Sequence, residues 1–85
     1  MLEPNDFQKM DLYNKINQLL LHGTYITKRH FLHFEVSLYY YNNFFVEVWK
    51  NFEFNSIYSI DLAPERSIKE AYLKSIDLKA LGLEI

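Results

Sequence analysis

The segment 37-SLYYYNNFFVEVW-49 carries the strongest structural signal in this chain, because two aromatic and apolar runs meet at a pair of asparagines. Runs rich in aromatic and β-branched residues are typical of β-strands. Asparagine tolerates the left-handed backbone that tight hairpin loops require. The segment therefore predicts an antiparallel hairpin that turns at Asn42 and Asn43.

The register of this hairpin follows from requiring one fully apolar face, since a slip of one residue would exchange the two faces. A three-residue loop of Tyr41, Asn42 and Asn43 meets that requirement. A two-residue Asn-Asn loop would instead place Leu38 opposite Glu47 and mix the faces, so the longer loop is predicted. The pairs predicted on the apolar face are Tyr40 with Phe44, Leu38 with Val46, and Val36 with Val48. The pairs predicted on the other face are Tyr39 with Phe45, Ser37 with Glu47, and Glu35 with Trp49.

A helix is predicted before the hairpin, over about residues 5–22. Leucine, isoleucine and tyrosine side chains recur there at helical spacing and form one apolar stripe, with Lys15 on the opposite, polar side. Asn5 can cap the first turn of this helix. Gly23 can supply the left-handed residue that commonly ends a helix.

An antiparallel meander is predicted between Thr24 and Leu62, where β-branched and aromatic residues dominate. The strands are expected over residues 32–40, 44–49 and 56–62. Residues 24–27 form either a short extra strand or a lead-in, with a break near Lys28 and Arg29. A second helix begins between Ala63 and Ser67, where Pro64 suits a first helical turn.

The predicted fold class follows from this order of elements. A helix, three strands and a helix give a two-layer α+β domain whose antiparallel meander sheet has three or four strands and carries both helices on one face. The chain of 85 residues is expected to form a single domain over 1–85. Its apolar tail, residues 78–85, is expected to pack on the body of the domain or on a partner.

Composition narrows the function classes. Nine Lys and Arg residues against eleven Asp and Glu residues give a net charge of −2, which argues against phosphate-driven nucleic-acid binding. The absence of cysteine fits a reducing compartment. No apolar run is long enough to span a bilayer, and the N-terminal residues lack the pattern of a signal peptide. A cytoplasmic protein without membrane contact is therefore expected, and its size and composition are like those of many small bacterial proteins.

The face predicted to stay uncovered carries the candidate interface. Tyr39, Phe45 and Trp49 are expected to lie there beside Glu35 and Glu47. Monomers seldom expose an aromatic patch, and tyrosine and tryptophan are enriched at interface centres. The sequence therefore predicts a protein-interaction module that binds a partner through this face, most simply a second copy of itself in a homodimer and otherwise another protein. The alternative is that the C-terminal tail covers the patch within one chain.

A ligand-binding or hydrolytic site is the first functional alternative, since Glu35, Glu47 and His33 could share the outer face. Paired carboxylates beside aromatic rings can perform acid–base chemistry or bind a sugar. His30 and His33 are three residues apart on an expected strand and point to opposite faces, so no metal site is predicted. No cofactor is expected either.

RNA binding is the second alternative, because the predicted element order is similar to that of double-stranded-RNA-binding domains. Such domains contact RNA through basic residues, notably at the start of the second helix. In this chain that position reads 63-APERSIKEA-71, where Arg66 and Lys69 are balanced by Glu65 and Glu70. Nucleic-acid binding is therefore an expectation from fold analogy alone.

Overall fold

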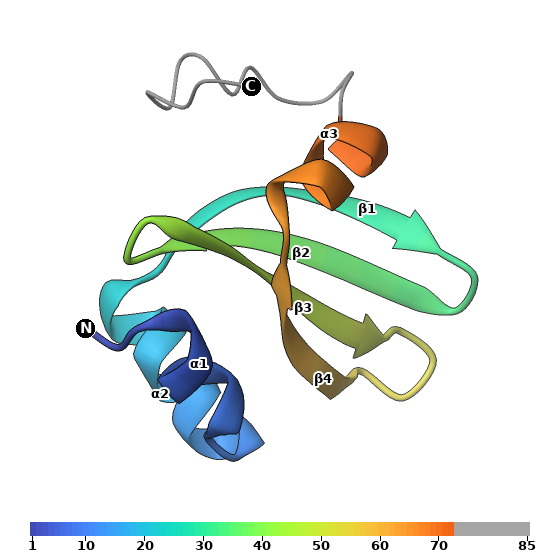
Figure 1. Cartoon of the computed structure of the whole chain (residues 1–85). Coiled ribbons are helices and arrows are strands. Elements are labelled where there is room, and N and C mark those ends of the chain that lie inside the picture. The colour runs from blue at the N-terminus through green and yellow to red at the C-terminus, as the bar shows by residue number, and fades with distance from the viewer. Residues whose placement is uncertain (73–85) are drawn as a thin grey trace.

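The computed structural model describes residues 1–72 and places two helices before a four-stranded sheet and one helix after it (Figure 1). The helices are α1 (Pro4–Lys9), α2 (Leu12–His22) and α3 (Glu65–Tyr72). The strands are β1 (Thr24–Phe31), β2 (Phe34–Tyr41), β3 (Phe44–Asn51) and β4 (Ser56–Ala63). They form an antiparallel meander in the order β1-β2-β3-β4, which confirms the predicted α+β class. The predicted tail, 78–85, lies outside the described residues.

The predicted N-terminal helix is two helices, α1 and α2, separated by extended backbone at Met10 and Asp11. The Asp11 carboxylate accepts a hydrogen bond of 2.8 Å from the Asn14 N–H and so caps α2, whereas α1 has no side-chain cap. Gly23 is extended, with φ −81° and ψ 154°, so the predicted left-handed conformation is wrong. A Cβ on Gly23 would lie 2.7 Å from the Leu19 carbonyl oxygen, and this close approach explains the glycine.

The hairpin between β2 and β3 turns through two residues, so the predicted three-residue loop is wrong. Leu38 lies opposite Glu47, which is the pairing expected of the two-residue loop and not of the predicted three-residue loop. Asn42 and Asn43 both have positive φ, 45° and 68°, as a tight two-residue turn of type I′ requires. The requirement for one apolar face misled the prediction, because helices cover both faces of this sheet.

The chain after Gly23 forms a full strand, β1, rather than a lead-in of four residues. It runs without interruption through Lys28 and Arg29, where the sequence predicted a break. Leu32 and His33, which were expected to open the next strand, instead form the turn between β1 and β2. The hairpin between β1 and β2 thus also has a two-residue loop.

Two clusters of buried side chains lie on opposite faces of the sheet. The first gathers beneath α1 and α2 and consists of Phe7, Leu19, Tyr41, Val46 and Ile60. The second gathers beneath α3 and consists of Leu38, Phe45, Ala63, Ile68 and Tyr72. Neighbouring residues of a strand point to opposite faces, so Phe45 and Val46 assign α3 and α2 to different sides of β3.

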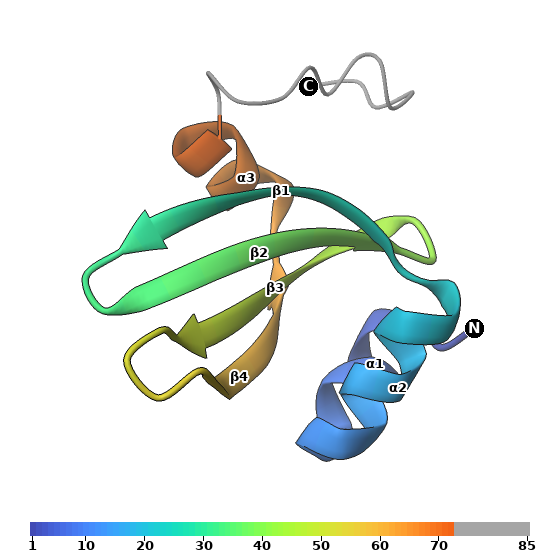
Figure 2. The same cartoon turned by 180° about the vertical axis from the view of Figure 1, so that it is seen from behind.

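The helices are therefore distributed differently from the prediction of both on one face. The α1–α2 pair and the sheet make the two main layers, and α3 is a short helix on the other face (Figures 1 and 2). The reason lies at the end of β4, where Ala63 pairs with Phe45 and is buried on that other face. Pro64 follows directly, and α3 folds back over the side to which Ala63 points.

The α1–α2 pair also closes the outer edge of β4. Lys15 is 8 % exposed, and its Nζ donates a hydrogen bond of 2.8 Å to the Ile60 carbonyl. The Leu62 N–H donates to the Gln8 side-chain oxygen at 3.1 Å. The predicted polar side of the helix therefore faces the sheet at Lys15, while Tyr13 and Leu20 of the predicted apolar stripe are exposed.

Candidate interaction surface

One aromatic side chain from each strand lines the part of the α3-bearing face that lies nearest the β1–β2 and β3–β4 loops. We call these residues the aromatic row; they are Phe31, Phe34, Trp49 and Tyr58. The Trp49 ring centroid lies 6.1 Å from that of Phe31 and 5.6 Å from that of Phe34. The Phe34 and Tyr58 centroids are 5.3 Å apart. The row thus crosses the whole width of the sheet through direct ring contacts.

The aromatic row is open to solvent over much of its length. Phe31 is 49 % exposed and Tyr58 is 71 % exposed, while Phe34 and Trp49 between them are half-buried. Rings at this exposure offer large apolar area on a rigid sheet. Such surfaces are characteristic of binding sites rather than of a solvated sheet face.

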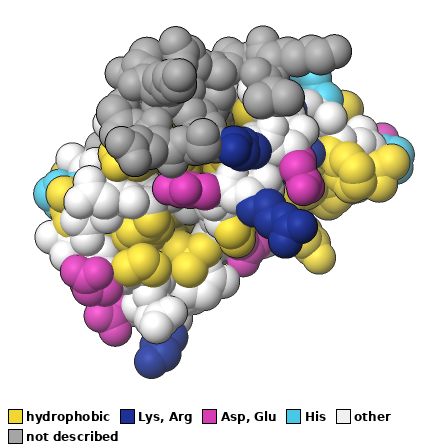
Figure 3. Space-filling model, turned by 45° about the horizontal axis from the view of Figure 1, so that its top comes forward, with side chains coloured by type: hydrophobic (Ala, Val, Ile, Leu, Met, Phe, Trp, Pro, Cys, Tyr) yellow, Lys and Arg dark blue, Asp and Glu magenta, His cyan; other side chains and the backbone are white. Residues whose placement is uncertain are grey.

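The loops beside the row extend the apolar surface. Leu32 in the β1–β2 loop is 77 % exposed, and Phe52 and Phe54 in the β3–β4 loop are 52 % and 76 % exposed. The Phe52 N–H donates a hydrogen bond of 3.3 Å to the His33 carbonyl and joins the two loops. Figure 3 shows a group of hydrophobic side chains at the right-hand end of the molecule, where these loops lie, and further hydrophobic side chains elsewhere on the same view. The loops and the row together form one hydrophobic end of the sheet.

Leu32 has an unusual backbone for its residue type. Its φ is 54°, and the other non-glycine residues with positive φ among residues 1–72 are asparagines, at positions 42, 43 and 55. A left-handed conformation costs a residue such as leucine about 1–2 kcal/mol. Strain of this kind persists where the surroundings enforce it and is concentrated at functional sites. An exposed leucine kept in that conformation therefore points to a use for this loop.

A polar cluster under α3 marks the inner limit of the aromatic row. The Glu47 carboxylate, 9 % exposed, accepts hydrogen bonds from Tyr72 Oη at 2.7 Å and from Arg29 Nη2 at 3.2 Å. Burial, together with the hydrogen bond to Glu47, raises the pKa of the Tyr72 hydroxyl well above its ordinary value. Tyr72 is therefore a neutral donor, and Arg29 balances the charge of Glu47. We call these three residues the Arg29 cluster.

Arg29 connects this cluster to the row. Its guanidinium carbon lies 5.4 Å from the Trp49 ring centroid, 5.9 Å from that of Phe31 and 5.5 Å from that of Tyr72. Cation–π contacts at such distances are worth about 0.5–1 kcal/mol when partly exposed. Arg29 therefore helps to hold the Trp49 and Phe31 rings in place.

The structure separates the predicted interface residues. Phe45 and Glu47 are buried beneath α3, at 3 % and 9 % exposure, and Trp49 lies on the same face in the aromatic row. Tyr39 and Glu35 lie on the opposite face, where α2 packs. The one-residue change of register accounts for this division. The predicted set therefore does not share one exposed face.

The predicted hydrolytic group is separated in the same way. Glu35 lies on the α2 face, with its carboxylate oxygens 3.1 Å from Lys28 Nζ and 3.4 Å from Lys50 Nζ, whereas Glu47 lies on the α3 face and His33 is in a turn. The hydrogen bond from Lys28 lowers the pKa of Glu35, which keeps this carboxylate ionised. Within residues 1–72, no group of His, Asp and Glu side chains is placed to hold a metal ion.

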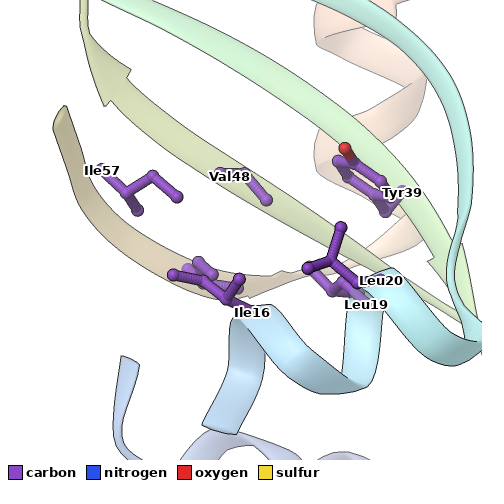
Figure 4. A pocket seen from close by; sticks show the side chains of 7 residues that line it. Ile16, Leu19, Leu20, Tyr39, Val48 and Ile57 are labelled. Carbon is purple, nitrogen blue, oxygen red and sulfur yellow. The ribbon is translucent and has the colours of Figure 1, made fainter. Parts of the chain in front are cut away.

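An apolar hollow of about 120 Å³ lies on the other face, between α2 and the sheet (Figure 4). Its lining residues are Ile16, Leu19, Leu20, Tyr39, Val48, Ile57 and Ile60. Apart from the Tyr39 hydroxyl, the lining side chains are hydrocarbon. The hollow therefore has none of the converging polar groups that a site for chemistry requires.

Sequence reasoning missed most of the aromatic row and the partners of Glu47. Phe31 and Phe34 flank a Leu-His pair, which is not typical of a two-residue turn, so the sequence had no local signal for this hairpin. Arg29 was assigned no role, because the break predicted near Lys28 and Arg29 left the face of its side chain undefined. The pairing of Tyr72 with Glu47 depends on where α3 packs and has no local signal.

The chain matches no family model, no curated protein and no solved structure. Among residues 1–72, no helix is long and apolar enough to cross a membrane. Function is therefore inferred from the geometry of the surface.

Proposed function

We propose that this chain is a small protein-interaction module that pairs with a second copy of itself through the aromatic row. The observation that carries the proposal is the contact of four exposed or half-buried rings, one from each strand, around Trp49. Tryptophan, tyrosine and arginine supply most of the binding energy at interfaces, near their centres. All three residue types are present here, with Trp49 and Tyr58 in the row and Arg29 in contact with it.

A second copy is the partner that the surface chemistry favours. The rings of the row are uncharged, and Arg29, the cation that contacts Phe31 and Trp49 among residues 1–72, is paired with Glu47. Two copies can therefore meet at the row without bringing like charges together. The small net charge of −2 adds little repulsion between chains. Closed two-fold contacts are also the commonest form of self-association.

The backbone of Leu32 supports the proposal that this surface forms the dimer contact. Its side chain stands beside Phe31 in a turn that a glycine or asparagine would form with less strain. In the dimer Leu32 buries its side chain against the partner chain, which offsets the cost of its backbone conformation.

The two alternatives have less support. The acids of the hydrolytic alternative lie on opposite faces, with Glu47 engaged by Arg29 and Tyr72. For RNA binding, the sheet has four strands rather than three, and Arg66 at the start of α3 pairs with Glu70 at 3.9 Å. We place the protein in the cytoplasm on the ground of its cysteine-free composition.

Sedimentation equilibrium of the wild type and of two matched aromatic variants tests this function. The wild type should dimerise at micromolar concentration, and Trp49→Ala should weaken the dimer about thirtyfold, as loss of a central tryptophan contact does. Tyr39→Ala, which removes a half-buried ring from the other face, should leave the dimer constant unchanged. A wild type that stays monomeric at high micromolar concentration would overturn the proposal, as would equal effects of the two variants.

A further inference from the structure

The two outer strands of the sheet have different edges. The outer edge of β4 is closed by Lys15 and Gln8, which bond the backbone of Ile60 and Leu62. β1 lies at the other end of the strand order, and within residues 1–72 its pairing partner is β2 alone (Figure 2). An edge strand presents a row of N–H and C=O groups to which another strand can add.

The register identifies the backbone groups that β1 presents. Phe31 and Phe34 close the two-residue hairpin and are a hydrogen-bonded pair, and bonded pairs alternate along an antiparallel ladder. Arg29 therefore bonds to β2, whereas the N–H and C=O groups of Lys28 and His30 point outward. The register shifts between Tyr25 and Thr27, which limits the regular edge to the residues from Thr27 to Phe31.

The side chains along this edge differ between the two faces. On the α2 face, Lys28 and His30 have side-chain exposures of 54 % and 64 %. Both lie near the Glu35 carboxylate, which is also 3.4 Å from Lys50. One carboxylate is therefore shared among two lysines and a histidine. The edge is therefore left with positive charge on this face. On the α3 face, the half-exposed Phe31 ring gives the edge an apolar contact.

We infer that the open edge of β1 accepts an extended peptide as a fifth strand, and that the residues of this peptide alternate between acidic and apolar side chains. Main-chain bonds to Lys28 and His30 supply the affinity, and the two faces supply the specificity. The acidic side chains meet Lys28 and His30, and the apolar side chains lie beside Phe31. This site shares the Phe31 ring with the aromatic row, but its main-chain bonds are made at the edge of β1 and do not require the dimer.

Charge also disfavours a second copy of β1 at this edge. Two antiparallel β1 strands would bring the exposed Lys28 and His30 side chains of each copy together on the α2 face. Like charges directly opposite one another destabilise a strand pair. An acidic strand removes this repulsion, so the edge discriminates between the two occupants.

Amide exchange in the ¹⁵N-labelled full chain tests the inference with two synthetic probes. One peptide alternates Glu and Val, and its control alternates Lys and Val at the same length. The Glu peptide should slow exchange at the Lys28 and His30 amides and should bind about tenfold more tightly than the Lys peptide, as one favourable charge contact allows. Lys28→Glu should reverse this preference, and Trp49→Ala should leave it intact even if the dimer is lost.

Three results would overturn the inference. The first is unchanged exchange at Lys28 and His30 with saturating Glu peptide. The second is strong protection of these amides in the free chain at low concentration, which would show that residues of the chain itself occupy the edge. The third is protection that grows with protein concentration in the absence of peptide, which would show that a second copy occupies it.

Discussion

Phe45 and Trp49 lie on the same strand, β3, and point to the same face of the sheet, yet their surroundings differ. Phe45 is 3 % exposed beneath α3, packed with Leu38 and Ile68. Trp49 is half-buried in a row of rings that no described helix covers. The aromatic content of the strand is therefore divided between a core and a surface. The position of a ring relative to α3 decides which role it has.

The Arg29 cluster lies between these two regions. Glu47 bonds Tyr72 on the covered side, and Arg29 contacts the Trp49 ring on the open side. A buried acid at this position would cost several kcal/mol without its partners. The cluster therefore links the docking of α3 to the order of the aromatic row.

The largest expected loss of stability comes from removing a buried ring beneath α3. Phe45→Ala should lower the free energy of unfolding by about 3–5 kcal/mol, because it leaves a cavity in a packed core. Trp49→Ala should lower it by about 1 kcal/mol, since that ring is only half-buried, while it weakens association. Urea unfolding of both variants measures the difference.

Phe45→Leu provides the control if Phe45→Ala does not fold. It keeps most of the apolar volume and should cost about 1.5 kcal/mol or less. Equal losses of stability for Phe45→Ala and Trp49→Ala would contradict the division of β3 into core and surface.

Replacing the two glutamates of the central strands, Glu47 and Glu35, should give the next largest difference in the free energy of unfolding. Glu47→Ala should lower the free energy of unfolding by about 3 kcal/mol, because it leaves Arg29 and Tyr72 without their buried partner. Glu35→Ala removes an acid from a solvent-facing ion pair and should cost less than about 1 kcal/mol. Chemical denaturation at neutral pH compares them, and a greater loss for Glu35→Ala would refute the assigned faces.

Tyr72→Phe should cost about 1.5 kcal/mol at neutral pH, where its hydroxyl bonds the charged Glu47. Because the pKa of Tyr72 is raised in the folded chain, this contribution should be complete below about pH 10, the ordinary pKa of tyrosine, and lost above it. The difference in unfolding free energy between wild type and variant should therefore be constant up to that pH and shrink beyond it. A difference that grows with alkaline pH would disagree with the raised pKa.

The smallest effect is expected at the exposed turn. Leu32→Gly should raise the free energy of unfolding of the monomer by about 0.5 kcal/mol, since relief of the left-handed strain exceeds the entropic cost of glycine. It should also weaken the dimer by removing a contact. Asn43→Gly, in the other two-residue turn, is the matched control and should leave the dimer unchanged. Thermal unfolding and sedimentation of both variants separate the two effects.

Much of the fold could be predicted from local patterns. The turn at Asn42 and Asn43, the strand pattern after Ser56 and the helix start near Pro64 all have short-range causes, and the structure has these elements close to where they were predicted. The break at Met10 was missed, because α1 and α2 together resemble one amphipathic run. Asp11, which caps α2, was the available local signal.

The candidate surface could be predicted only in part, because the face to which a side chain points depends on the strand register, and its exposure depends on where the helices pack. Trp49 was placed on an open face, and the structure has it in the open row. Phe45 and Glu47 were placed beside it and are covered, because α3 occupies a face that the sequence left empty. Glu47 is a charged residue on a buried face, which the alternation of polar and apolar residues along a strand does not predict. Its burial depends on hydrogen bonds from Arg29 and Tyr72, which are distant in the sequence.

Trp49 is the only tryptophan in the chain, so its fluorescence reports directly on dimerisation through the aromatic row. Its emission and its quenching by acrylamide are measured from low to high micromolar protein, together with the sedimentation mass. If Trp49 is buried in the dimer contact, its emission should shift to the blue and its quenching should fall over the same concentrations at which the mass doubles. A doubled mass with unchanged Trp49 emission, or a mass that never doubles, would contradict this dimer contact.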